Sequence, residues 1–168
     1  MGRSILNIRN LKENEFSFLL DMMYESIFIP KNKPPKEELL NFPHIKKYHE
    51  GWGRIGDRAF IALTNENEPI GAAWYRLFKR DQKGYGYVND FTPELGIAVK
   101  DGQRGKGIGT LLMKKLMEQA LKDGYPALSL SVDPNNIEAV QLYKKLGFKQ
   151  CCLSGTSWTM VYTISSNS

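Results

Sequence analysis

Apolar and polar residues follow two periods along this chain, one typical of strands and one typical of helices. Strands are expected where short apolar runs or alternating patterns occur, at residues 5–9, 58–64, 70–78, 87–99, 127–132, 148–153 and 157–164. Helices are expected where apolar residues recur every three or four positions, at residues 13–28, 36–40 (continuing irregularly to 50), 107–122 and 136–146. The alternation contains no repeat, low-complexity tract or long linker, so it predicts one α/β domain over residues 1–168.

Proline and glycine residues mark where these elements end. Three prolines between residues 30 and 35 end the first helix, and Pro43 interrupts the second. Residues 65–69 separate two apolar runs and predict an antiparallel hairpin with a loop of about five residues. Gly124 and Gly147 stop the third and fourth helices.

The clearest helix lies at residues 107–122. Its apolar stripe consists of Ile108, Leu111, Leu112, Leu116 and Ala120. A strand at residues 94–99 precedes it and a buried strand at residues 127–132 follows it. This arrangement predicts that the two strands are parallel and joined by a right-handed crossover.

A glycine-rich turn at residues 103–109 opens that helix. Its glycines let a ligand approach the backbone closely and direct several N–H groups the same way. The first N–H groups of a helix lack internal partners and carry about half a positive charge, which favours a phosphate. Arg104 and Lys106 add to this attraction.

Two familiar phosphate loops do not match the turn. A nucleotide P-loop has Lys-Ser or Lys-Thr after its last glycine, and a dinucleotide fingerprint that begins at Gly105 has a small residue where Thr110 stands. A formal glycine match at residues 51–56 follows a polar stretch and precedes a strand rather than a helix. We therefore interpret it as a chance match in a loop.

The helix at residues 136–146 places Asn136 and Tyr143 on nearly the same face, roughly 10 Å apart along its axis. That separation suits an elongated cofactor. The alternative is that Tyr143 packs its ring beside its apolar neighbours Ala139, Leu142 and Leu146. The strand at residues 94–99 has two unlike faces, since bulky residues alternate with Glu94, a glycine and an alanine.

Composition narrows the classes of partner. The 168 residues are 42% hydrophobic and 11% aromatic, which is ample for a packed core, and the net charge is +5. That charge suits nucleic acid, a membrane surface or a phosphorylated cofactor, or simply keeps the protein soluble. The lysines are scattered and no aromatic-basic recognition motif occurs, so nucleic acid is not expected as a partner.

The chain shows no membrane or metal signal. No run of about 18 apolar residues occurs, so no membrane association is expected and the protein is expected in the cytoplasm. Cys151 and Cys152 are adjacent, a spacing that joins no distant segments and fits a reducing compartment. His44 and His49 have no partner at metal-ligand spacing, so no metal site is expected.

Arg104, Gly107 and Gly109 follow a spacing that resembles the phosphate-binding signature of the GNAT superfamily of N-acetyltransferases: Arg or Gln, two residues, Gly, one residue, then Gly or Ala. The resemblance extends through residues 94–99 before the turn and residues 131–148 after it. It implies a single GNAT-like domain with a mixed, mostly antiparallel central sheet, a parallel splayed strand pair in its middle, and helices on both faces. In that family the strand that corresponds to residues 94–99 is bulged and splays away from its parallel neighbour.

The resemblance also implies a cofactor, acetyl-CoA, that serves as acetyl donor. The residues implied in binding it are Ile97, Ala98, Val99, Arg104, Gly105, Lys106, Gly107, Ile108, Gly109, Thr110, Asn136 and Tyr143. Tyr143 is implied as the proton donor to the leaving thiolate. The reaction implied is transfer of acetyl to a primary amine of a small molecule or peptide, by direct attack in a ternary complex.

An amine needs to lose a proton to attack a thioester. Glu94 is the candidate general base, with Asp90, a water molecule, or a merely structural Glu94 as alternatives. The glutamate of ribosomal-protein acetyltransferases would stand at Ser131, which makes that subfamily less expected. Acceptor specificity is implied in residues 28–52 and 151–158, where no motif identifies the acceptor.

Two further alternatives stay open. The chain could instead be a non-catalytic module that binds CoA as a sensor, with the phosphate turn kept and the acceptor pocket closed. Dimerisation is common in the resembled family, so a homodimer is an open expectation that nothing in the sequence decides.

Overall fold

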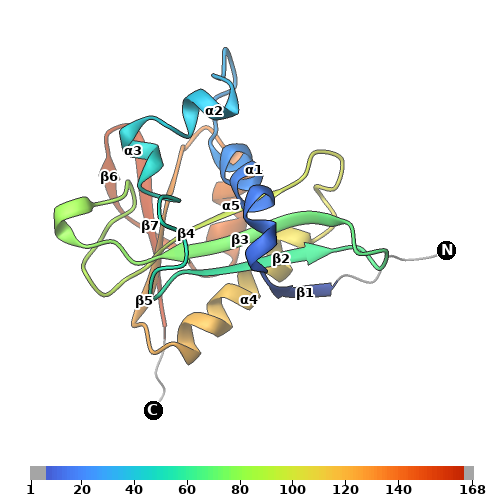
Figure 1. The fold of residues 1–168 in the computed structure, drawn as a ribbon. Helices are drawn as coiled ribbons and strands as arrows, with labels where there is room; N and C mark the ends of the chain where they lie inside the picture. Colours follow the sequence, from blue (N-terminus) through green and yellow to red (C-terminus); the bar gives the residue numbers. More distant parts are fainter. Residues whose placement is uncertain (1–6, 165–168) are drawn as a thin grey trace.

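A mixed sheet of seven strands runs through residues 7–164, the part of the chain that this computed structural model describes. The strands are β1 (Asn7–Asn10), β2 (Arg58–Leu63), β3 (Pro69–Arg76), β4 (Glu94–Val99), β5 (Ala127–Val132), β6 (Lys149–Ser154) and β7 (Ser157–Thr163). Their order across the sheet is β1-β2-β3-β4-β5-β7-β6. Figure 1 shows the sheet passing from β1 to β6 through the middle of the molecule.

The parallel pair that the sequence predicts lies at the centre of the sheet. β4 and β5 run parallel, whereas all the other neighbouring strands in the described residues are antiparallel. β4 pairs with β3 along its whole length, from Glu94 to Val99, but meets β5 at the single pair Glu94↔Ser129. The two strands therefore splay apart after Glu94. The expected bulge in β4 is not present, because its register with β3 is continuous.

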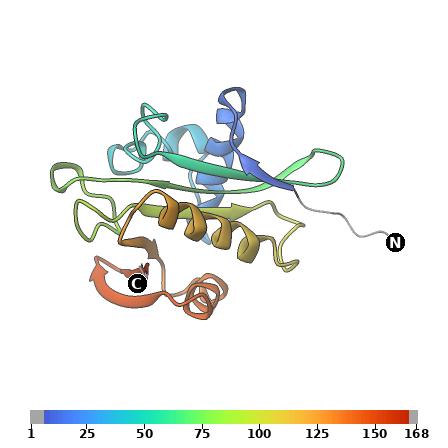
Figure 2. The same ribbon diagram turned by 90° about the horizontal axis from the view of Figure 1, so that it is seen from below.

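Helices cover both faces of the sheet, as the sequence predicts. They are α1 (Phe16–Ser26), α2 (Lys36–Leu39), α3 (Pro43–Lys46), α4 (Ile108–Lys122) and α5 (Ile137–Lys145), with short 3-10 turns η1 (Glu13–Glu15) and η2 (Arg80–Gln82). Figure 2 shows the blue to cyan segment with α1 on one face and the gold helix α4 on the other.

Two apolar clusters hold these layers together. The larger one joins α4 and α5 to the sheet through buried residues such as Leu112, Leu116 and Leu130. The smaller one joins Leu19 and Met23 of α1 to the other face. The predicted stripe of α4 is correct except for Leu111, which is 46% exposed. Its place is taken by Met113, because the buried stripe centres on residues 112–120 and Leu111 points away from it.

Several predicted elements are shorter in the structure. The first helix begins after a 3-10 turn and ends at Ser26, and Pro43 starts α3 instead of merely interrupting a longer helix. The strand expected at residues 87–99 was wrong for residues 87–93, which form turns and loop. The hairpin β2–β3 is confirmed, and residues 51–56 lie in a loop before β2. Residues 5 and 6 of the first predicted strand lie outside the described residues.

Residues 7–164 contain neither a membrane-spanning helix nor a cluster of metal ligands. No helix in that range combines the length and apolar character needed to cross a bilayer. Within the same range no three His, Cys, Asp or Glu side chains gather as metal ligands. The sulfur atoms of Cys151 and Cys152 are bonded to each other, which joins neighbours within β6 and connects no distant segments.

Candidate active site

The glycine-rich turn leads directly from β4 into α4. Gly107 is the N-cap of the helix at φ 80°, and Gly105 also has φ 80°, a left-handed conformation that side chains disfavour. The first intrahelical bond runs from the Leu111 N–H to the Gly107 carbonyl, and no side chain caps the helix. The N–H groups before Leu111 therefore remain available to an anion.

Two basic side chains lie on this turn. The Arg104 Nε donates to the Val99 carbonyl at 3.0 Å, which fixes the guanidinium beside the end of β4. Its terminal nitrogens lie 3.7 Å from a Glu25 carboxylate oxygen and 3.6 Å from an Asp101 carboxylate oxygen. The Lys106 Nζ donates a hydrogen bond to the Gln103 Oε1 at 3.3 Å. Because Arg104 is half exposed, its weak ion pairs are easily exchanged for pairs with a phosphate.

A cavity of about 590 Å³ opens beside the turn. It lies between the end of α1, the end of β4, the start of α4 and one face of α5. Most of the predicted cofactor-binding residues line it: Ile97, Ala98, Val99, Arg104, Gly105, Gly107, Ile108, Gly109, Thr110, Asn136 and Tyr143. Of that predicted set only Lys106 does not line it, and the proposed base Glu94 lies outside it too.

Splaying of the sheet brings the backbone of β4 to this cavity. After Glu94 no residue of β4 has a partner on β5, so the backbone groups of residues 97–99 on that side have no strand to pair with. Ile97 and Val99 pack against the larger apolar cluster, while Ala98 belongs to the smaller one. The two unlike faces that the sequence predicts for this strand are thus confirmed.

Tyr143 extends from α5 into the wall of the cavity. The residue is 8% exposed, and its ring lies against the Phe148 ring with centroids 6.0 Å apart. Burial raises the pKa of the Tyr143 hydroxyl above its ordinary value of 10, so the hydroxyl keeps its proton at neutral pH. Asn136 is the N-cap of α5, and its side-chain oxygen accepts from the Ala139 N–H at 3.4 Å. The amide nitrogen of Asn136 is left for a ligand.

Glu94 lies at the start of β4, where the strand still meets β5. The residue is 5% exposed, and its Oε2 accepts a hydrogen bond from the Tyr48 hydroxyl at 2.8 Å. Its Oε1 is buried without a hydrogen-bond partner among the described residues. Burial raises the pKa of Glu94 from 4.5 to about 7, against smaller lowering effects of the Tyr48 hydroxyl, the Gly86 backbone and the Lys47 charge. A carboxyl group with this pKa both takes up and releases a proton near neutral pH.

Asp90, the alternative base, has a different environment. The Tyr87 hydroxyl donates to its Oδ1 at 2.6 Å. This hydrogen bond lowers the pKa of Asp90 below its ordinary value, so the carboxylate is a weaker base than Glu94. Of these two carboxylates, Glu94 has the higher pKa.

Sequence reasoning missed how Glu94 is enclosed. The sequence does not indicate Tyr48 as a partner of Glu94, because the two residues are 46 positions apart and Tyr48 lies in an irregular segment. It also missed the buried ion pair between Arg76 and Asp57, 2.8 Å apart and each 2% exposed. Arg76 further donates to the carbonyls of Lys47 and Glu50, so this pair ties residues 47–57 to the sheet. No sequence spacing indicated these contacts.

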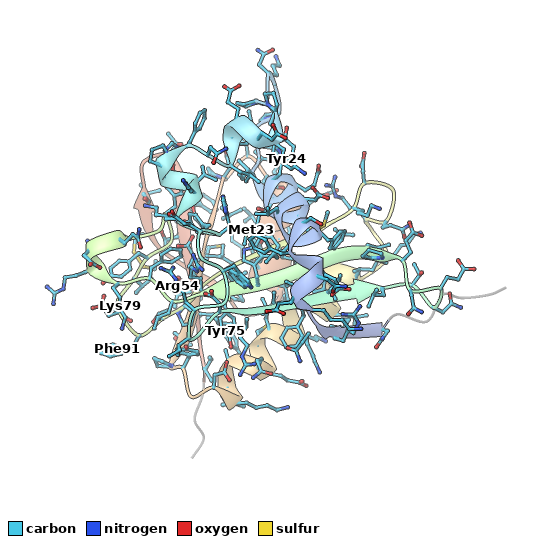
Figure 3. All side chains as sticks on the ribbon, viewed as in Figure 1. Met23, Tyr24, Arg54, Tyr75, Lys79 and Phe91 are labelled. Atoms are coloured by element: carbon cyan, nitrogen blue, oxygen red, sulfur yellow. A yellow bond between two sulfur atoms is a disulfide. The ribbon has the colours of Figure 1, made fainter. Side chains whose placement is uncertain are left out.

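Figure 3 shows all the described side chains on the ribbon. Met23 and Tyr24 lie on α1, above the sheet in that view, while Lys79 and Phe91 lie on the long connection from β3 to β4 at the side of the molecule. That connection contains the residues that cover Glu94.

Comparison with known proteins gives relatives along much of the chain. A family model described as the acetyltransferase (GNAT) family matches residues 19–148. L-methionine sulfoximine/L-methionine sulfone acetyltransferase of Pseudomonas paraeruginosa is 31% identical over 67% of this chain, and the match spans 63% of that protein's length. Streptothricin acetyltransferase A of Bacillus subtilis is 30% identical over 76% of this chain and 69% of its own length.

Solved structures share the fold. The structure of yncA from Salmonella typhimurium, determined with its cofactor acetyl-CoA, has a TM-score of 0.69 to this chain and covers 98% of it, and the match spans 97% of yncA. The sequence identity is 13%, so this likeness shows the fold alone.

Proposed function

The chain belongs to the acetyltransferase (GNAT) family, and from that premise we propose that it transfers the acetyl group of acetyl-CoA to the primary amine of a small molecule or peptide, by direct attack in a ternary complex. The observation that carries the proposal is the cavity in which the phosphate turn, the unpaired edge of β4 and Tyr143 meet. Each of these features suits a different part of acetyl-CoA.

The turn suits the diphosphate. Free N–H groups at the start of α4, together with Arg104, provide the positive field that an anion needs. Left-handed glycines at positions 105 and 107 leave the backbone open, since a Cβ added at either would meet nothing within 4 Å. The residues present therefore fit a phosphorylated cofactor.

The edge of β4 suits the pantetheine arm, whose amides can pair with a strand. The backbone groups of residues 97–99 have no β5 partner there, and the pantetheine arm would take that partner's place. When bound, acetyl-CoA supplies a thioester whose carbonyl carbon accepts the amine as the carbon–sulfur bond breaks. A backbone N–H of β4 stabilises the negative charge on the carbonyl oxygen, which is usually worth a few kcal/mol in acyl transfer.

Two protein groups move the protons. Glu94 accepts the proton that the acceptor nitrogen loses, and Tyr143 donates the proton that the departing sulfur takes up. The protein ends with one proton gained and one lost, and exchange with water restores both groups. No activated Ser or Cys nucleophile lies among the described residues that line the cavity, which favours direct transfer over a covalent enzyme intermediate.

The relatives give a first view of the acceptor. Their names include L-methionine sulfoximine and streptothricin, both small molecules, so we place small amines first and peptides second. The test is thiol release from acetyl-CoA against amino acids, methionine sulfoximine, polyamines, aminoglycosides and peptides. A sequential kinetic pattern with one strong acceptor supports the proposal. Tight binding of CoA with no thiol release from any acceptor would instead favour the sensor alternative.

A further inference from the structure

The hydroxyl group of Tyr48 connects its own segment to Tyr85 and Glu94, which lie 37 and 46 residues further along the chain. Tyr48 follows α3 and donates its hydroxyl proton to the Glu94 Oε2 at 2.8 Å. The Tyr48 hydroxyl oxygen in turn accepts a hydrogen bond from the backbone N–H of Tyr85 at 2.6 Å. Because the Tyr85 N–H occupies the oxygen as a donor, the hydroxyl proton is directed to Glu94.

The two carboxylate oxygens of Glu94 are consequently unequal. Oε2 is held by Tyr48, whereas Oε1 is buried and has no hydrogen-bond partner within residues 7–164. The hydroxyl of Ser129, at the single β4–β5 pair, is likewise buried with no partner in the described part of the chain. Unpartnered buried polar atoms are rare in proteins and call for an explanation. Here both atoms belong to the last residue pair before β4 and β5 diverge.

A short cover, defined as residues 84–86, closes over this point. A Cβ added to Gly84 would lie 2.2 Å from the Glu94 Oε1 and 2.7 Å from the Tyr48 hydroxyl. A Cβ added to Gly86 would lie 2.7 Å from the Leu130 carbonyl carbon. The cover thus lies directly on Glu94 and on β5, at a distance that only glycine allows.

We propose that Tyr48 is a positioning residue for the general base, which holds the Glu94 Oε2 and the cover together and so leaves Oε1 as the oxygen that takes the acceptor's proton. This inference rests on the proposed function. In that step the N–H bond of the acceptor breaks, the proton forms a bond with Oε1, and its electron pair stays on nitrogen to attack the thioester. Because Oε1 is buried beneath the cover, this step requires the cover to move off Oε1.

Other charged groups near Glu94 are engaged elsewhere. Arg76 is the register partner of Glu94 on β3, but its guanidinium binds Asp57 and the carbonyls of residues 47 and 50. Lys47 donates to the Lys83 carbonyl at 2.5 Å and acts on Glu94 through its charge alone. The Tyr48 ring contacts the Phe78 ring edge to face, with centroids 5.0 Å apart, and Tyr48→Phe preserves that contact. The substitution therefore removes the hydroxyl group and little else.

The experiment compares Tyr48→Phe with Tyr24→Phe as its matched control. Tyr24→Phe likewise removes a part-buried hydroxyl group, which donates to the Pro34 carbonyl at 2.7 Å and not to Glu94. The pKa of Glu94 is measured by ¹³C NMR of its labelled carboxyl carbon. The acidic limb of kcat/KM is measured with the strongest acceptor found in the panel, and CoA binding by calorimetry.

We expect Tyr48→Phe to raise the NMR pKa of Glu94 and to move the acidic limb to higher pH, both by about one pH unit or more, because a hydrogen bond to the ionised form is lost. CoA affinity is expected to stay within about twofold, and Tyr24→Phe to leave the pKa and the limb unchanged. The inference is overturned if the NMR pKa of Glu94 does not change in Tyr48→Phe. It is also overturned if that pKa rises but the acidic limb of the kcat/KM profile stays at the same pH. Normal CoA binding without thiol release from any acceptor contradicts the proposed function itself, and the inference falls with it.

Discussion

Replacing Glu94 by Gln should change how the stability of the protein depends on pH. Glu94 is buried, and its pKa in the folded protein is about 7 against 4.5 as the ordinary value. Each pKa unit corresponds to about 1.4 kcal/mol, so ionising Glu94 is about 3 kcal/mol less favourable in the folded chain than in the unfolded chain. Gln has nearly the same shape and does not ionise.

The sign follows from the higher pKa in the folded state. Below pH 4.5 both states hold the proton, and Glu94 contributes its full stability there. As the pH rises from 4.5 to 7 the unfolded chain releases its proton first, so the wild-type protein loses stability relative to Glu94→Gln. Above pH 7 the loss is complete, at about 3 kcal/mol.

The assay is urea unfolding of both proteins between pH 4 and pH 8.5, from which the difference in unfolding free energy is taken at each pH. Other titrating groups are common to the two proteins and cancel in that difference. Asp90→Asn serves as the control, because the pKa of Asp90 is lowered from 3.8 and the group is ionised in both states above about pH 5, so its difference should stay flat from there to pH 8.5. A difference between wild type and Glu94→Gln that stays flat over this range would refute a buried, high-pKa Glu94.

Three further substitutions test other parts of the account. Tyr143→Phe should lower kcat at least tenfold with CoA affinity within about threefold, and an unchanged kcat would remove Tyr143 as the acid. Gly107→Ala places a side chain at φ 80° and should weaken CoA binding about tenfold in calorimetry, whereas Gly155→Ala, at φ 62° and equally open, should leave it unchanged. Asp57→Ala leaves Arg76 buried without its carboxylate partner and should lower the unfolding free energy by about 3–5 kcal/mol. A loss below about 1 kcal/mol would show that the ion pair is not needed for stability.

That the residues of the glycine-rich turn and of α5 lie around one cavity could be expected from the sequence, because the information is local. The turn at residues 103–109, the start of α4 and the spacing from Asn136 to Tyr143 all lie within short stretches whose geometry follows from glycine content and helical period. The structure brings these residues around one cavity without any further assumption.

The surroundings of Glu94 could not be predicted in the same way, because their contacts join distant segments. Tyr48 lies in an irregular stretch that the Arg76–Asp57 pair holds in place, and neither contact has a periodic signal. The strand expected over residues 87–93 fails for a related reason. The Asn89 side chain accepts from the Phe91 N–H and the Thr92 hydroxyl, which stabilises a turn there instead of a strand.

The most direct test of the central claim is an NMR titration of the ¹⁵N-labelled protein with CoA. If the diphosphate binds at the start of α4, the largest changes in amide chemical shift will fall on residues 105–110, with smaller ones along residues 97–99 of β4. Saturation with no change at the turn, or with the largest changes elsewhere on the molecule, would contradict the account.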